Sequence, residues 1–414
     1  MGSVMKHRGW IGVALLLGLA TAGAVRVAAQ DWPQWRGPNR DGASVSFRAP
    51  SSWPEALGSR WKIEVGQGYA TPLLVDDRIH LFSRQGEEEV MTALDAASGE
   101  VIWRTSYPAP FEMNSSTARH GPGPKSTPAY AGGRLYSFGM SSIVTAFDAS
   151  TGRQIWQRPA TEAQPSFHTA MSPLVDGSGV IIHTGGPGDT ALLALDAATG
   201  AVQWRWEGDS PAYGSPVVVD VSGVRQVVTF THRNLVGVSR ATGELLWSRP
   251  FTTPSDTSSQ TPILYRDTII QAGRANGITA FRAFQRDGGW VTEDVWQTQE
   301  VSLHMTNGVA VDGVLYGLSH LNAGQYFALD LSDGTVLWKS PPRQAENAGM
   351  VNAGDTVFAL EDDGELLAFE ASRDGFSPIR RYEVADSETW TQPTISGNSV
   401  YVKDVSHLTL WTLN

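Results

Sequence analysis

The stretch "ALDAASGEVIW" at residues 93–103 has the pattern of a short strand, a tight turn and a second strand that ends in tryptophan. Near-copies follow at 146–156 ("AFDASTGRQIW"), 194–204 ("ALDAATGAVQW") and 328–338 ("ALDLSDGTVLW"). In each copy the aspartate can accept hydrogen bonds from the backbone two residues on, and the glycine supplies the positive φ that a hairpin with a bulge demands. The stretch therefore predicts a β-hairpin that recurs along the chain.

The tryptophan at the end of this stretch belongs to a longer repeat. It recurs at intervals of 42 to 53 residues, with Tyr382 in the next place: Trp61, Trp103, Trp156, Trp204, Trp247, Trp296 and Trp338. A second β-rich run, opened by a small residue and often proline, gives eight units, the first being "TPLLVDDRIHLF" from Thr71. Four short strands in a unit of this length match a propeller blade. We therefore predict an all-β, eight-bladed β-propeller of four-stranded antiparallel blades, with each indole on an outermost strand against the neighbouring blade.

The last unit, from Gln392, leaves room for only three strands before residue 414. The stretch "SRWKIEV" at 59–65 has the pattern of an outer strand with no preceding strands of its own. We expect it to complete the C-terminal blade and close the ring, which protects the edges of the sheet. Residues 59–414 are thus predicted to form one propeller, with 30–58 as an N-terminal segment outside the blades.

Residues 1–29 are predicted to be a secretory signal peptide, because an apolar run of 14 residues is flanked by basic residues and no acid. An uncleaved membrane anchor is the alternative, although a span needs about 20 apolar residues. The protein is expected to be periplasmic or secreted, without a membrane span after cleavage. Without the three cations of this segment, 28 Lys and Arg stand against 42 Asp and Glu, which disfavours nucleic-acid binding. The lack of cysteine excludes disulfides, thiolate metal sites and a lipid anchor on cysteine.

The repeated pattern "LDxxTGxxxW" resembles the repeat of β-propeller proteins of the pyrroloquinoline quinone (PQQ) type, and the resemblance covers residues 59–414. The stretch "DWPQWRGPNRDG" at 31–42 also resembles the segment that opens many exported bacterial proteins of this class. The resemblance implies one of two kinds of function. Quinoprotein dehydrogenases are enzymes that use PQQ with Ca²⁺, whereas envelope-assembly scaffolds of the BamB type are non-enzymatic.

Several features separate this sequence from the dehydrogenases. Its units average about 44 residues, which leaves little room for the long insertions that build the active site of those enzymes. Their typical adjacent cysteine pair is missing, and no Glu, Asn and Asp set for Ca²⁺ and a catalytic carboxylate can be assigned. BamB-type scaffolds are lipid-anchored through a cysteine, which this chain also lacks. A soluble relative of the scaffolds without a cofactor is therefore expected, and PQQ with Ca²⁺ is expected only under the dehydrogenase alternative.

Loops at one end of a propeller usually carry its function. Two sets of loops are predicted to share a face: those that lead into each inner strand and those that join each second and third strand. The candidate residues on this face are His120, Lys125, His168, His232, Arg233, Asn234, Arg274, Asn276, His304, His320, Asn322, Trp390 and His407. They suggest a polar pocket for an anionic or sugar-like ligand, or for a metal ion held by imidazoles. Solvated or structurally bonded histidines are the alternative, since no metal-ligand spacing is present.

Two further histidines, His80 and His183, are predicted to lie within strands. No catalytic residue and no metal site are assigned. The sequence predicts an exported, non-catalytic binding or scaffold protein of the cell envelope, with an envelope protein or a small polar ligand as its partner. The alternative is a PQQ-dependent quinoprotein dehydrogenase that acts on an alcohol or a sugar.

Overall fold

The repeated aspartate–glycine stretch forms a tight hairpin turn, as predicted. In its first copy, Asp95 Oδ1 accepts hydrogen bonds from the backbone N–H groups of Ala97 and Ser98 at 3.1 and 2.7 Å. Gly99 closes the turn at a φ of 75°, in the left-handed region that favours glycine. The computed structural model describes residues 1–2, 30–165, 167–186, 188–254 and 258–413.

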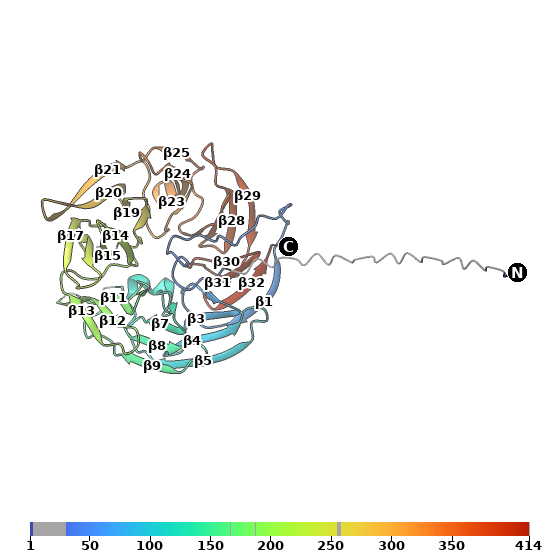
Figure 1. Ribbon diagram of the computed structural model, residues 1–414, viewed down its shortest axis with the longest axis horizontal. Coiled ribbons are helices and arrows are strands. Elements are labelled where there is room, and N and C mark those ends of the chain that lie inside the picture. The colour runs from blue at the N-terminus through green and yellow to red at the C-terminus, as the bar shows by residue number, and fades with distance from the viewer. Residues whose placement is uncertain (3–29, 166, 187, 255–257, 414) are drawn as a thin grey trace.

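Eight four-stranded antiparallel sheets surround a central axis (Figure 1). Blade 1 has β2 (Leu73–Val75), β3 (Arg78–Gln85), β4 (Glu88–Asp95) and β5 (Val101–Pro108). Blade 2 has β6 (Ala129–Ala131), β7 (Arg134–Phe138), β8 (Val144–Asp148) and β9 (Gln154–Arg158). Blade 3 has β10 (Leu174–Asp176), β11 (Gly179–Gly186), β12 (Asp189–Asp196) and β13 (Val202–Trp206). Blade 4 has β14 (Val217–Val221), β15 (Val224–Phe230), β16 (Asn234–Ser239) and β17 (Leu245–Pro250).

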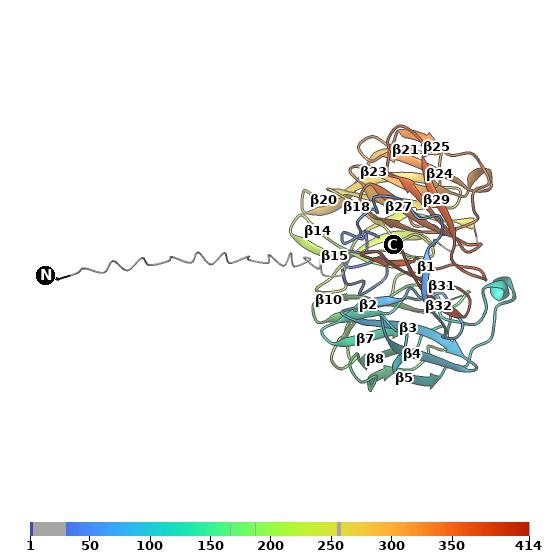
Figure 2. The same cartoon turned by 90° about the vertical axis from the view of Figure 1, so that its right-hand side faces the viewer.

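The second half of the ring repeats this arrangement. Blade 5 has β18 (Ile263–Tyr265), β19 (Thr268–Gly273), β20 (Gly277–Arg286) and β21 (Gly289–Thr298). Blade 6 has β22 (Val309–Val311), β23 (Val314–Ser319), β24 (Gln325–Asp330) and β25 (Val336–Lys339). Blade 7 has β26 (Ala348–Asn352), β27 (Thr356–Glu361), β28 (Glu365–Glu370) and β29 (Pro378–Glu383). Among the described residues, the 3₁₀ helices η1 (Ser115–His120) and η3 (Leu321–Ala323) lie in loops, and η1 projects from one face of the disc (Figure 2).

Blade 8 closes the ring with strands from both ends of the chain. It contains β30 (Thr394–Ser396), β31 (Ser399–Lys403), β32 (His407–Thr412) and β1 (Gly58–Glu64). Strand β1 is the outermost and pairs antiparallel with β32, with Lys62 opposite Thr409. The prediction that residues near 59–65 complete the C-terminal blade is confirmed.

The outer-strand tryptophans join neighbouring blades, as predicted. Trp103 of blade 1 donates its indole N–H to the carbonyl oxygen of Ala149 in blade 2 at 3.1 Å. Its ring covers the turn glycine Gly152, where an added Cβ would lie 2.4 Å from a ring carbon. The indoles that donate to a backbone carbonyl of the next blade in the same way are those of Trp61, Trp156, Trp204, Trp296 and Trp338.

Trp247 is an exception to this pattern. Its indole N–H donates to Oε1 of Gln226, in its own blade, at 2.7 Å. Blade 5 differs from the other blades at this contact: β20 and β21 extend to ten residues each, and they turn through Asp287–Gly288 instead of the repeated LDxxTGxxxW stretch.

The small polar residues that open the inner strands form a belt of hydrogen bonds around the axis. The backbone N–H of Thr71 donates to Oγ1 of Thr127 at 3.0 Å, and the N–H of Thr127 donates to Oγ of Ser172 at 2.9 Å. Ser172 continues the series to Oγ of Ser215 at 3.0 Å. Each hydroxyl satisfies a buried backbone donor of the preceding blade, which explains why Ser or Thr often stands in this position.

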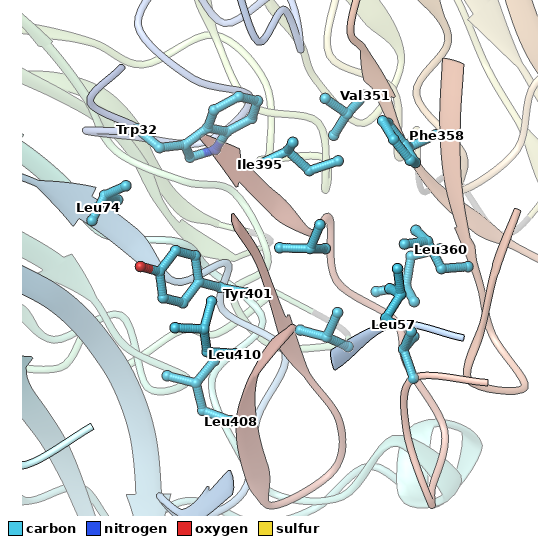
Figure 3. Packing of buried hydrophobic residues seen from close by; sticks show 14 of the residues in the cluster. Trp32, Leu57, Leu74, Val351, Phe358, Leu360, Ile395, Tyr401, Leu408 and Leu410 are labelled. Atoms are coloured by element: carbon cyan, nitrogen blue, oxygen red, sulfur yellow. The ribbon is translucent and has the colours of Figure 1, made fainter. Parts of the chain in front are cut away.

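A hydrophobic cluster ties the N-terminal segment to the point of closure. Trp32 is fully buried and belongs to one cluster with Leu74 of blade 1, Phe358 of blade 7, and Ile395 and Tyr401 of blade 8 (Figure 3). This packing fixes the segment before the chain enters β1.

Candidate functional site

A pocket of about 400 Å³ opens at the centre of the face on which loops lead into the inner strands. Each of these eight loops contributes at least one residue to its lining. These residues, in chain order, are Tyr69, Lys125, Ser172, Ser215, Thr261, Asn307, Asn347 and Trp390. The volume is within the range of about 300–1,000 Å³ that small-ligand sites occupy. The pocket is therefore built by all eight blades together.

The floor of the pocket comes from the N-terminal segment. Trp35 lines the pocket, and its indole N–H donates to Oγ1 of Thr261 in blade 5 at 3.0 Å. On either side of Trp35, the segment 32–46 forms hydrogen bonds with blades 1, 2, 3, 6, 7 and 8. A segment that reaches all these blades must cross the axis. It closes the channel below the pocket, so that the pocket is open on one side.

Two buried arginines hold this segment in place. Arg36 is 2% exposed and donates to the carbonyl oxygens of Asn307 and Gly308 at 3.2 and 2.7 Å. Arg40 is 5% exposed and donates to the carbonyl oxygens of Ser172 and Pro173 at 3.2 and 3.0 Å. Burial lowers the pKa of Arg36 to about 10 and that of Arg40 to about 9, so both remain charged at neutral pH. They link blades 3 and 6 across the axis.

One wall of the pocket carries Lys125 above aromatic rings. The Nζ atom of Lys125 lies 3.5 Å from the Phe167 carbonyl oxygen and 5.7 Å from the centre of the Tyr213 ring. Tyr213 in turn donates its hydroxyl to the same carbonyl at 2.6 Å. Burial lowers the pKa of Lys125 to about 8, so the side chain is still mainly an ammonium at neutral pH. Among the described residues, no carboxylate forms an ion pair with it.

The glycine-rich loop that carries Lys125 packs closely against the loop before blade 1. An added Cβ at Gly123 would lie 2.3 Å from backbone atoms of Gln67, so only glycine fits there. The backbone N–H of Tyr69 donates to the Pro124 carbonyl at 2.8 Å. Lys403 of blade 8 is buried and holds the loop before blade 1 by donating to the Gly68 carbonyl at 3.1 Å. The stretch "GPGPK" at 121–125 is thus shaped for close backbone contact.

The rim beside this wall is aromatic. His120 packs edge-on against Trp390 with 4.5 Å between ring centres, and Arg119 lies over the same indole at 5.0 Å. Burial, followed by the charges of Lys125 and Arg119, lowers the pKa of His120. The imidazole is therefore neutral at neutral pH. The acids on this rim are already engaged: Glu346 pairs with Arg119 at 3.2 Å, and Glu388 accepts from Nε1 of Trp390 at 2.9 Å.

The opposite wall holds Arg274 with two histidines. Arg274 and His304 line the pocket, and the rings of His304 and His320 are 5.8 Å apart. Burial, followed by the charges of Arg274 and His320, lowers the pKa of His304 to about 4. Arg274 is exposed and forms no ion pair within the part of the chain that the structure describes. As far as its described residues go, this wall therefore presents one cation without an ion pair, together with neutral imidazoles.

The structure brings together only some of the residues predicted on this face. His120, Lys125, Arg274, His304 and Trp390 line the pocket, and His320 lies directly behind His304. The others lie elsewhere: His168 is buried against Phe111 at 5.0 Å, His232 bonds Ser210 through its backbone, and His407 contacts Ser406 at 3.1 Å. Arg233, Asn234, Asn276 and Asn322 are likewise outside the lining.

Sequence reasoning missed the floor and much of the aromatic lining, notably Trp35, Tyr69, Phe167 and Tyr213. The dense segment "DWPQWRGPNRDG" was the available signal, since two tryptophans and two arginines outside the blades need a place to be buried. The two histidines predicted within strands do lie there, His80 in β3 and His183 in β11.

The lining does not fit a calcium-bound quinone. Ca²⁺ takes six to eight oxygen ligands, usually with carboxylates among them. The described side chains of the lining include no Asp or Glu. The oxygens of its two asparagines are engaged: Oδ1 of Asn307 accepts from the Thr261 N–H at 2.7 Å, and Oδ1 of Asn347 accepts from Thr306 at 3.0 Å. Within the described residues there is also no group of three or more His, Asp or Glu side chains arranged to hold a metal.

The fold and its repeat define a β-propeller of the PQQ-like repeat class. A family model described as outer membrane protein assembly factor BamB matches residues 86–340, more than half of the chain, and the protein belongs to this family. No helix among the described residues is long and apolar enough to cross a membrane.

Individual relatives include both assembly factors and enzymes. The chain is 29% identical over 263 residues to the outer membrane protein assembly factor BamB of Yersinia pestis, covering 59% of this chain and 65% of that protein, just under two thirds of its length. It is 29% identical over 150 residues to the dehydrogenase subunit of a quinone alcohol dehydrogenase of Acetobacter aceti, covering 33% of this chain and 19% of that protein. The quinohemoprotein alcohol dehydrogenase structure from Comamonas testosteroni, 17% identical, superimposes with a TM-score of 0.68 over 95% of this chain and 81% of that one, which shows the shared fold.

Proposed function

We propose that this protein is a non-catalytic binding protein of the cell envelope, exported by the leader at residues 1–29, which docks a partner on the face where the central pocket opens. The observation that carries this proposal is the pocket itself: among the described residues no carboxylate lines it, and its asparagine oxygens serve the hydrogen-bond belt. Membership of the BamB family supports the scaffold role. Residues 3–29 lie outside the described residues, so export rests on the sequence.

The enzyme alternative needs a cofactor site that these side chains do not offer. A dehydrogenase that uses PQQ requires Ca²⁺ ligands and a carboxylate to take the substrate proton. Two acids described on the pocket rim, Glu346 and Glu388, are bound to Arg119 and Trp390. We therefore expect no oxidation of alcohols or sugars.

Two measurements test the proposal. First, the purified protein is mixed with PQQ and CaCl₂, and thermal unfolding and dye reduction with ethanol or glucose are followed. A ligand at a hundred times its Kd adds about 2.7 kcal/mol of stability. We expect no dye reduction and no stabilisation by PQQ that depends on CaCl₂; turnover would show that the protein is a dehydrogenase.

Second, a photo-crosslinking amino acid is placed at exposed Glu388 on the pocket rim and, as a matched control, at exposed Asp267, in the β18–β19 turn on the other face. In cells that express each variant, we expect an exported envelope protein to be crosslinked from position 388 and not from 267. Equal crosslinking from both positions, or none from either, would contradict docking on the pocket face.

A further inference from the structure

We propose that the central pocket binds a carboxylate carried beside an aromatic group, and that no metal ion takes part. This inference rests on the proposed function and gives the ligand chemistry of the same pocket. Such a group occurs in a free aromatic acid and at the C-terminal end of a polypeptide whose last residue is aromatic. The two sources are separated by the experiment below.

The charge of the lining points to an anion. Lys125 and Arg274 are its only charged residues in the part of the chain that the structure describes, and both are cations. The ammonium of Lys125 has three N–H donors, while its contacts there are one carbonyl at 3.5 Å and one aromatic ring. Lys125 is half-buried, and a ligand carboxylate supplies the charged acceptor that its ammonium lacks there. The chain as a whole is acidic, with a net charge of −11, so this cationic pocket contrasts with the rest.

The shape and apolar lining point to an aromatic body. The floor is the indole of Trp35, and Phe167 and Tyr213 form an edge-to-face pair in the wall below Lys125 with 6.2 Å between ring centres. Trp390 stands on the rim. Aromatic rings favour offset or edge-on contact with other rings at 4.5–7 Å. A ring beside the carboxylate can therefore pack on Trp35 or Tyr213 while its acid group meets Lys125.

The closed floor restricts how a polypeptide can bind. Because the N-terminal segment crosses the axis below Trp35, a chain cannot pass through the ring. It can enter by an end or by the tip of a loop, and of these only an end carries a backbone charge. The amino end is a cation and is repelled by Lys125 and Arg274, whereas the carboxyl end is attracted by them. A polypeptide partner would therefore insert its C-terminus.

Binding is measured by isothermal titration calorimetry with the full exported chain at pH 7 and low salt. The probes are N-acetyl-phenylalanine, its amide, and a Gly-Ser octapeptide that ends in phenylalanine, with a free or an amidated C-terminus. We expect saturable binding of the acids, at least tenfold weaker binding of the amides, and no effect of EDTA. Loss of a charge-assisted hydrogen bond corresponds to about tenfold to a hundredfold in Kd.

Variants locate the site. Lys125→Met removes the ammonium and keeps an apolar chain of similar length. Arg274→Gln removes the guanidinium charge at an exposed position and leaves a shorter, neutral polar side chain. Both variants are expected to weaken the binding of the acids by about tenfold or more and to leave the binding of the amides unchanged. Lys339→Met is the matched control, because Lys339 pairs with Glu300 on an outer strand at 3.0 Å, and it should bind as the parent protein does.

The probes distinguish the two sources of the ligand. Binding of both acids indicates a polypeptide C-terminus as the ligand, and binding of N-acetyl-phenylalanine alone indicates a free acid. Equal binding of acids and amides, loss of binding with EDTA, or no binding of any probe would overturn the inference. If the inference is overturned while position 388 still crosslinks an envelope protein, the proposed function stands. If Lys125→Met does not fold, the binding measured with Arg274→Gln and with the amides still tests the inference.

Discussion

Replacing Gly152 by alanine should destabilise the protein more than the same change at Gly133. Both glycines have nearly the same φ, 74° at Gly152 and 77° at Gly133. An alanine in this left-handed region costs about 1–2 kcal/mol. At Gly133 an added Cβ meets nothing within 4 Å, so Gly133→Ala should cost only this amount. At Gly152 the Cβ would lie 2.4 and 2.6 Å from ring carbons of Trp103, and such overpacking adds about 1–3 kcal/mol.

The expected loss in the free energy of unfolding is therefore about 1–2 kcal/mol for Gly133→Ala and about 2–5 kcal/mol for Gly152→Ala. Urea unfolding followed by tryptophan fluorescence measures both, with the slope m compared to confirm that only stability has changed. Since the backbone term is common to the two variants, their difference isolates the contact between blades 1 and 2. Equal losses would refute the conclusion that Trp103 and this turn hold the blades together.

Three further changes have defined outcomes. Arg36→Met leaves the buried Asn307 and Gly308 carbonyls without a donor and should lower the free energy of unfolding by about 2 kcal/mol or more in urea. Thr127→Val keeps the side-chain shape but removes the acceptor of a buried backbone N–H, so urea unfolding should show a loss of about 1–3 kcal/mol. Burial raises the pKa of Glu361 to about 7, so the folded state binds more protons than the unfolded state between pH 4.5 and 7 and stability falls as pH rises through this window. Glu361→Gln should flatten that fall when unfolding is measured at pH 5 and pH 7, and an unchanged slope would show that another group titrates.

The fold was predictable because its signals are local. The turn at Asp95 is determined by an aspartate that accepts from the N–H groups two and three residues after it, and by a glycine four residues after it, with no help from distant residues. The interval of the tryptophans then gives the number of blades. Blade 5 shows the limit of this reasoning: its long hairpin lacks the turn, and Trp247 bonds its own blade.

The candidate site was predictable only in part. The face was evident, since loops that lead into inner strands lie at one end of a propeller, and His120, Lys125, Arg274, His304 and Trp390 do meet at the pocket. Nothing local distinguishes them from His168, His232 or His407, which lie outside it, because the distance of a loop residue from the axis depends on how far the loop leans inward.

By itself, the sequence determined the blade, the number of blades and the strand that closes the ring, because hydrogen bonds and dihedral preferences within ten or so residues specify the hairpin and its repetition specifies the rest. Only the tertiary structure decided that the ring encloses a blind, cationic pocket. Its floor is Trp35. The segment is held there because Arg36 and Arg40 donate to carbonyl oxygens of blades 6 and 3, which lie 132 to 272 residues further along the chain. Such contacts use backbone carbonyls. Because every residue has one, a local sequence pattern cannot identify the residues that accept these hydrogen bonds.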